Sequence, residues 1–244
     1  MSLYFYNTKN HRELINNYYC STMKTLMLSI LLCCFVIGAA NAQSTKTYHV
    51  KRYTLTFINQ DATLDTALQQ RMVNTFFKVY PELAKAYNKK PAKAVTMVID
   101  TTYKGVAETD NGKVTISSRW MHLHPEDIDV ITHEVMHIVQ DYGNSTGPGW
   151  LTEGIADYAR YKFGINNTAA KWALPPYKLT QKYDNAYRIT ARFLVWVEEK
   201  VKPGIVKELD SQLRKHTYTE NSWQQLTGKS VDELWKSYTE NPAV

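Results

Sequence analysis

The pentapeptide His133-Glu134-Val135-Met136-His137 constrains the fold most, because only a helix brings its two histidines together. Side chains four residues apart on a helix lie one turn above each other, so both imidazoles can reach one metal ion. Glu134 is offset around the helix and can reach a water molecule on that ion. The competing interpretation is a helix with two unrelated surface or core histidines.

The residues around the pentapeptide favour a helix with one buried face. Apolar residues recur there at helical spacing and leave the two histidines on roughly the opposite side. This apolar stripe consists of Ile128, Ile131, Val135, Ile138, Val139 and Tyr142. Pro125 suits a first helical turn. Acidic residues stabilise the positive end of a helix, and three follow the proline: Glu126, Asp127 and Asp129. We therefore expect a helix that starts near Pro125 and points its histidines into a cleft.

A second acidic pair follows the pentapeptide. Glu153 and Asp157 are four residues apart and share a face of the next predicted helix. The loop from Gly143 to Gly149 allows that helix to fold back antiparallel, and the small residues Gly154 and Ala156 allow a close approach. A catalytic zinc site has three protein ligands and one open position, so either acid can complete the set. An ordinary solvated pair of acids is the alternative.

The rest of the chain predicts strands first and helices afterwards. Strands are expected at residues 48–59, 94–99 and 114–116, the last one beyond the turn signal Asp110-Asn111-Gly112. Residues 64–87 predict one helix, or two helices that meet near Pro81. Almost everything after Pro125 predicts helix, with breaks at residues 143–149, 166–167, 175–176 and 203–204. This order predicts an α+β fold in which a small sheet packs against helices.

The first 42 residues are expected to lie outside the folded domain. Met23-Lys24, an apolar run from Leu26 to Ala40 and the small-x-small site Ala40-Asn41-Ala42 are typical of a secretory signal peptide. The alternative is a membrane anchor, but the run is shorter than the roughly 20 residues that span a bilayer. Residues 1–22 precede this signal and suggest a wrongly assigned start. We therefore predict a signal peptide at 23–42 and one domain at 43–244, secreted or periplasmic, with no membrane span.

The charge of this predicted mature domain argues against a nucleic-acid partner. Removing Lys9, Arg12, Lys24 and Glu13 reduces the 29 basic and 23 acidic residues to 26 and 22, a net charge of +4. The charges are scattered and form no basic patch. All three cysteines (Cys20, Cys33 and Cys34) precede the predicted cleavage site, so a metal would have to be held by histidine, aspartate or glutamate.

Taken together, these segments resemble the basic secretory protein-like peptidases of plants and bacteria. The family motif is H-E-x-x-H, a glycine-rich loop and E-G-I-A-D-Y, matched here at residues 133–137 and 153–158. The resemblance continues through residues 187–194 and 226–235. It implies a zincin-like fold of the gluzincin type, with a small mixed sheet, an active-site helix and a helical C-terminal half.

The resemblance also implies the roles of the site residues. One zinc ion would be held by His133, His137 and Glu153, with Glu134 as the general base. Asp157 would accept the free N–H of a ligand histidine. The interval from His137 to Glu153 is shorter than in the best-known gluzincins, so Asp157 remains an alternative ligand.

The expected activity is zinc-dependent hydrolysis of a protein or peptide substrate by a monomer. The oxyanion of the reaction needs a second electrophilic group besides zinc. Tyr187 is the first candidate, followed by Arg192 and His216; the competing and stronger interpretation is a structural tyrosine, because the chain has 17 tyrosines. His122 and His124 are expected to be surface or capping residues, and Trp150 is a candidate for the cleft wall. The alternatives are a non-catalytic secreted binding protein that retains a metal site, and a hydrolase acting on a non-peptide bond.

Overall fold

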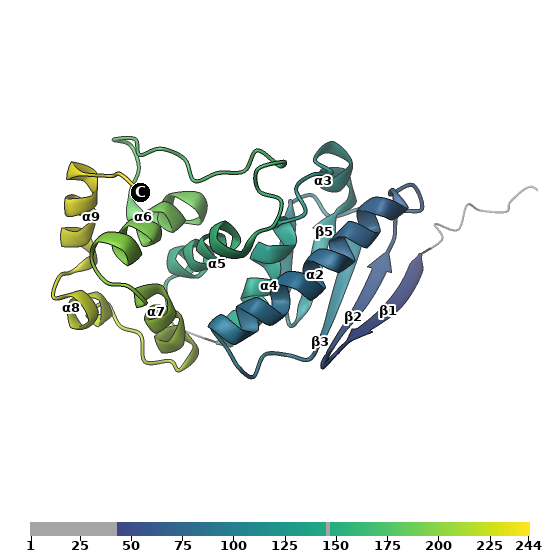
Figure 1. The fold of residues 1–244 in the computed structure, drawn as a ribbon, viewed down its shortest axis with the longest axis horizontal. Coiled ribbons are helices and arrows are strands. Elements are labelled where there is room, and N and C mark those ends of the chain that lie inside the picture. The colour runs from purple at the N-terminus through teal and green to yellow at the C-terminus, as the bar shows by residue number, and fades with distance from the viewer. Residues whose placement is uncertain (1–42, 145–146) are drawn as a thin grey trace, which may run out of the picture. The chain divides into compact units, whose positions relative to one another are not determined.

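The N-terminal half of the domain is built on a five-stranded sheet (Figure 1). The computed structural model describes residues 43–144 and 147–244, so the predicted signal peptide and the segment before it lie outside the described residues. The strands are β1 (Ser44–Val50), β2 (Tyr53–Asn59), β3 (Ala94–Asp100), β4 (Ala107–Asp110) and β5 (Lys113–Ser117), in the order β1-β2-β3-β5-β4. The three central strands are parallel, and β1 and β4 pair antiparallel at the two edges. The sheet is therefore mixed, as predicted.

The single strand predicted for residues 48–59 is wrong, because two strands of a hairpin occupy this region. β1 and β2 pair from Ser44 opposite Asn59 to Val50 opposite Tyr53, and a two-residue turn joins them. Lys51 in that turn has a φ of 54°, a conformation that lysine rarely adopts. The turn contains no glycine, asparagine or aspartate, so the sequence carried no signal for it.

The second hairpin confirms the predicted turn at Asp110-Asn111-Gly112. Asp110 pairs with Lys113, and the two residues between them have φ values of 46° and 74°. Positive φ at both central positions is the requirement of a type I′ turn, which asparagine followed by glycine meets. The strand before the turn, β4, was not predicted because its four residues show little apolar alternation.

Helix α2 (Thr66–Ala86) connects the parallel strands β2 and β3 and is continuous through Pro81. The carboxylate of Asp65 caps its first turn by accepting a hydrogen bond from the Leu68 N–H at 2.7 Å. The helix packs against helix α4 (Val130–Gln140), as Figure 1 shows. Of the two predicted alternatives for residues 64–87, the structure has the single helix.

Helix α4 (Val130–Gln140) carries the histidines, and the predicted start near Pro125 is wrong. The acids expected in its first turn have other partners. The buried carboxylate of Asp127 pairs with Arg160, and that of Asp129 accepts hydrogen bonds from two backbone N–H groups after the following helix. These acids anchor the segment before α4 and do not extend the helix. All six residues of the predicted apolar stripe are nevertheless buried.

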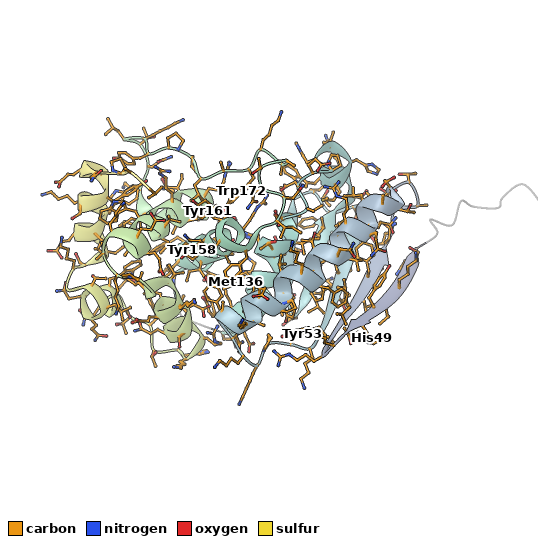
Figure 2. The ribbon with its side chains drawn as sticks, in the orientation of Figure 1. His49, Tyr53, Met136, Tyr158, Tyr161 and Trp172 are labelled. Atoms are coloured by element: carbon orange, nitrogen blue, oxygen red, sulfur yellow. The ribbon has the colours of Figure 1, made fainter. Side chains whose placement is uncertain are left out.

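The second half is helical, as predicted. It contains α5 (Gly149–Phe163), the 3₁₀ turn η1 (Tyr183–Asn185), α6 (Tyr187–Lys200), α7 (Ile205–Arg214), α8 (Ser222–Thr227) and α9 (Val231–Glu240), while α3 (Ser118–Leu123) precedes α4. The predicted breaks fall between helices, but the helix expected between and after the breaks at 166–167 and 175–176 is wrong, because residues 164–182 contain no helix. Met136 of α4 and Tyr158 of α5, labelled in Figure 2, are buried in the interior. Within the part of the chain that the structure describes, no helix is long and apolar enough to span a bilayer.

Close packing of α5 involves a different neighbour from the one expected. Gly154 faces Thr190 of α6, and a Cβ atom on Gly154 would lie 2.2 Å from Thr190 Cγ2. The sequence suggested that this glycine allows α5 to approach α4. It instead allows α5 to approach α6, while Ala156 is fully buried.

Candidate active site

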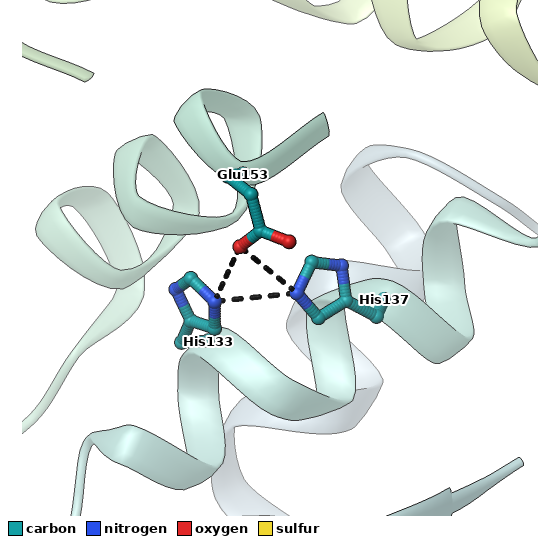
Figure 3. A group of neighbouring side chains, drawn as sticks. All are labelled: His133, His137 and Glu153. Atoms are coloured by element: carbon teal, nitrogen blue, oxygen red, sulfur yellow. Dashed lines mark hydrogen bonds and ion pairs between the residues drawn. The ribbon is translucent and has the colours of Figure 1, made fainter. Parts of the chain in front are cut away.

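Two histidines of α4 and one glutamate of α5 direct one ligand atom each towards a shared position (Figure 3). His133 Nε2 lies 3.2 Å from His137 Nε2 and 3.2 Å from Glu153 Oε2. His137 Nε2 lies 3.6 Å from the same glutamate oxygen. Ligand atoms about 2.0–2.1 Å from a tetrahedral zinc ion lie roughly 3.3 Å from one another. The spacing of the three atoms therefore fits zinc.

The other ring nitrogen of each histidine is already engaged. His133 Nδ1 lies 2.7 Å from Oδ1 of the buried Asp157, and His137 Nδ1 lies 2.7 Å from Gln140 Oε1. Both partners are acceptors, so each Nδ1 carries a proton, and each Nε2 offers its lone pair when the ring is neutral. Two lone pairs and a carboxylate oxygen thus converge, which is the electronic arrangement that a cation stabilises.

Gln140 was not identified from the sequence. Its amide orientation is fixed, because Nε2 donates to the carbonyl oxygen of Thr152 at 2.9 Å and turns Oε1 towards His137. The residue is buried in the last turn of α4, three positions after His137. The spacing from His137 is the one trace of this role in the sequence. The role itself depends on the start of α5, where the Thr152 carbonyl oxygen accepts the hydrogen bond from the Gln140 amide.

The carboxylates around His133 control its protonation. Burial lowers the pKa of His133, but hydrogen bonds to Asp157 and Glu153 outweigh burial and raise the pKa to about 10. Burial acts to raise the pKa of Glu153, and the two histidines outweigh it and lower that pKa. The site therefore favours positive charge between its carboxylates, which either a proton or a divalent cation can supply.

Glu134 lies beside this group and is held by the edge strand. The hydroxyl of Thr109 on β4 is a donor 2.8 Å from Glu134 Oε2 and 3.0 Å from the Glu134 carbonyl oxygen. Glu134 is buried, yet it lines the cleft. Thr109 carried no signal in the sequence, because it lies 25 residues before Glu134 in a strand that was not predicted.

Tyr187 reaches the site from the start of α6. Its ring stacks on His133 with the ring centroids 6.2 Å apart and the planes at 22°. The carboxylate of Glu153, together with burial and the neighbouring acids, raises the pKa of Tyr187, so its hydroxyl stays protonated and can donate. Tyr187 is 56% exposed, so burial in the core does not hold its side chain. Its φ of 50° is a backbone conformation that tyrosine rarely adopts.

The other oxyanion candidates do not line the cleft. Arg192 donates to the carbonyl oxygen of Pro242 at 2.9 Å, and His216 is exposed beyond α7. Trp150 does not line the cleft either, because it packs against Tyr183 and Trp223 in the helical half.

Two further histidines have the structural roles expected of them. His122 is partly exposed and lies 2.8 Å from the carboxylate of Asp61. His124 is the C-cap residue of α3, and its ring lies against that of Trp120. Neither histidine lines the cleft around the three converging atoms.

The site opens into a cleft of about 1040 Å³. One border is β4 with its turn (residues 107–112), and another is α4 with the loop that follows it. Thr152 and Glu153 of α5, Tyr187 of α6, and Tyr103 and Ala92 complete the lining. All the groups with proposed chemical roles, namely Glu134, Tyr187 and the three converging residues, face this one space.

The chain is similar to parts of much longer solved structures. An M1 zinc metallopeptidase from Deinococcus radiodurans is 14% identical, with a TM-score of 0.46 over 83% of this chain and 53% of that protein. An aminopeptidase N family protein from Idiomarina loihiensis is 8% identical, with a TM-score of 0.44 over 83% of this chain and 45% of that protein. The chain thus spans about half the length of these proteins.

The sequence itself places the chain in a family. A comparison with curated proteins finds no match. The profile of the family described as "Peptidase of plants and bacteria" matches residues 36–238, which cover most of the chain and include every residue of the site. The predicted resemblance is confirmed, and the chain belongs to this peptidase family of plants and bacteria.

Proposed function

We propose that this chain is a zinc-dependent metallopeptidase with His133, His137 and Glu153 as the metal ligands. One observation carries the proposal: two histidine Nε2 atoms and one carboxylate oxygen converge while both Nδ1 atoms are held by other side chains. Three protein ligands and a side open to a cleft are the features of catalytic zinc sites, whereas structural sites are closed by four ligands. When bound, zinc lowers the pKa of a coordinated water to roughly 7 and polarises the scissile carbonyl.

Glu134 is the general base in this proposal. Thr109 engages Oε2, which leaves Oε1 to accept a proton from the attacking water. The same oxygen then delivers the proton to the leaving amine, as general acid–base catalysis requires. The hydrogen bond from Thr109 fixes the carboxylate in one orientation and keeps it directed at the cleft.

Tyr187 is the proposed donor to the oxyanion. Its protonated hydroxyl and its stacked position over His133 support this role. Preorganised donors of this kind typically contribute about 10²- to 10³-fold to the rate. Asp157 and Gln140 act as positioning residues, because each holds one histidine ring by its Nδ1.

The size of the cleft supports a polypeptide substrate. Its volume of about 1040 Å³ lies at the upper end of the range for small-molecule pockets, roughly 300–1,000 Å³, so the cleft has room for several residues of a peptide. We also propose that residues 23–42 direct export to the periplasm or the exterior, and that residues 43–244 act as a monomer. The N-terminal sequence pattern supports export.

Hydrolysis of casein and of a peptide library, with and without a chelator, tests the proposal. We expect turnover that the chelator abolishes and added zinc restores. Glu134→Gln should bind zinc without turnover, because the amide cannot accept the proton. Glu240→Gln, at the exposed end of α9, is the matched control and should behave as the wild type. Binding of peptide and zinc by the wild type without any turnover would instead identify a non-catalytic binding protein.

A further inference from the structure

The cleft has a charge opposite to that of the whole chain. The chain carries a formal net charge of +6, yet the residues that line the cleft include five carboxylates and no lysine or arginine. The five are Glu108, Asp110, Glu134, Asp141 and Glu153. The three converging ligand atoms define the site without these charges. The carboxylates therefore affect only which substrates the cleft binds.

Two of the five carboxylates are accounted for by the proposed chemistry. A divalent cation would balance Glu134 and Glu153. The other three form no ion pair within 4.0 Å among the described residues. Asp110 accepts a hydrogen bond from the Asn111 amide at 3.1 Å, and Glu108 lies near the hydroxyl of Tyr103. Both of these partners are neutral, so three negative charges remain without compensation.

The three uncompensated carboxylates lie on two borders of the cleft. Glu108 and Asp110 flank Thr109 on the edge strand β4 and are exposed. Asp141 is exposed at the C-terminal end of α4, one turn beyond His137, where the helix dipole adds negative potential. The nearby Arg214 does not offset it, because its guanidinium binds two α4 carbonyls and Asp210 and does not line the cleft.

We propose that Glu108, Asp110 and Asp141 make the cleft selective for peptides with lysine or arginine near the scissile bond. The inference rests on the proposed peptidase function. A cationic substrate side chain gains attraction from three charges, whereas an acidic one is repelled by the same charges. Each partly exposed pair changes an equilibrium a few-fold, so two or three acting together give a preference of about tenfold or more.

Matched peptides test this selectivity. Three peptides differ at one position beside the scissile bond, which carries lysine, norleucine or glutamate, and a second set varies the position on the other side. We expect kcat/KM to fall in the order lysine, norleucine, glutamate in at least one set, with a lysine-to-glutamate ratio of about tenfold or more at low salt. The ratio should shrink as the salt concentration rises, because salt screens exposed charges.

Neutralising the carboxylates provides the second test. The double variant Asp110→Asn/Asp141→Asn should lower the lysine-to-glutamate ratio several-fold, while Glu240→Gln should leave it unchanged. A partly unfolded preparation lowers both rates equally, so the ratio reports on recognition alone.

The outcomes separate this inference from the proposed function. Equal kcat/KM values for the lysine and glutamate peptides would overturn the selectivity while leaving the peptidase intact. If zinc-loaded protein cleaves none of the peptides, the proposed function fails. Binding of fluorescently labelled versions of these peptides to the wild type then tests the cleft directly. Tighter binding of the lysine peptide would support selectivity for cations, and equal binding would refute it.

Discussion

Substitution of Gly154 by alanine tests how α5 is positioned. The new Cβ atom would lie 2.2 Å from Thr190 Cγ2 and 2.7 Å from Thr190 Cβ. Thr190 is fully buried, and its Cβ is attached directly to the backbone of α6, so it cannot swing away. The two helices must separate, which would displace Glu153 from the histidines of α4.

The magnitude follows from two opposing effects. Overpacking a buried contact costs about 1–3 kcal/mol, and the short contact places this site near the upper end of that range. Alanine regains about 0.5–1 kcal/mol over glycine inside a helix. The net loss in the free energy of unfolding is about 2 kcal/mol. At about 2–4 °C per kcal/mol for a domain of this size, Tm should fall by about 4–8 °C.

Thermal unfolding followed by circular dichroism measures this change. Gly149→Ala is the matched control, because Gly149 begins the same helix and a Cβ atom added to it would have no neighbour within 4 Å. That control should be neutral or slightly stabilised. Thr190→Ser removes Cγ2 and should recover part of the stability lost in Gly154→Ala. A Gly154→Ala protein with an unchanged or higher Tm would refute the packing argument.

Three further predictions concern the metal ligands, the residues behind them and the ion pair before α4. Glu153→Ala should release most of the zinc, whereas Asp157→Asn should keep zinc with an affinity lowered by about 10- to 100-fold. Zinc titration checks both variants, and the reverse pattern would mean that the two acids have exchanged roles. Gln140→Ala should weaken zinc binding by about tenfold, because His137 loses its Nδ1 acceptor, and an unchanged zinc affinity would exclude this role. Arg160→Ala should cost about 3 kcal/mol of unfolding free energy, because the buried negative charge of Asp127 loses its cation and keeps the hydrogen bond from the Trp120 indole. A denaturant midpoint equal to that of the wild type would contradict this.

Local patterns in the sequence predicted most of the site. The spacing of His133 and His137 requires only a helix, and the apolar stripe of α4 fixes which side of that helix is buried. The turn at residues 110–112 was predictable because asparagine and glycine tolerate positive φ. Local patterns did not predict the third ligand. The helix period allows either Glu153 or Asp157 of α5 to face the histidines, and only the family resemblance favoured Glu153. The structure places Glu153 with the histidines and Asp157 behind His133.

Features that depend on distant contacts could not be predicted. The start of α4 is displaced because Asp127 and Asp129 bind groups on and beyond α5, which no local pattern reveals. Thr109 reaches Glu134 only after β4 joins the sheet edge. The hairpin turn at Lys51 has a residue that is unusual at positive φ, so strand pairing imposes the turn against local preference.

The zinc content of the purified chain tests the central claim most directly. The claim is that His133, His137 and Glu153 hold one metal ion at the base of the cleft. Elemental analysis by mass spectrometry, before and after dialysis against zinc, should give about one zinc ion per chain. A chain that contains no zinc after gentle purification, and takes up none on reconstitution, would contradict the account.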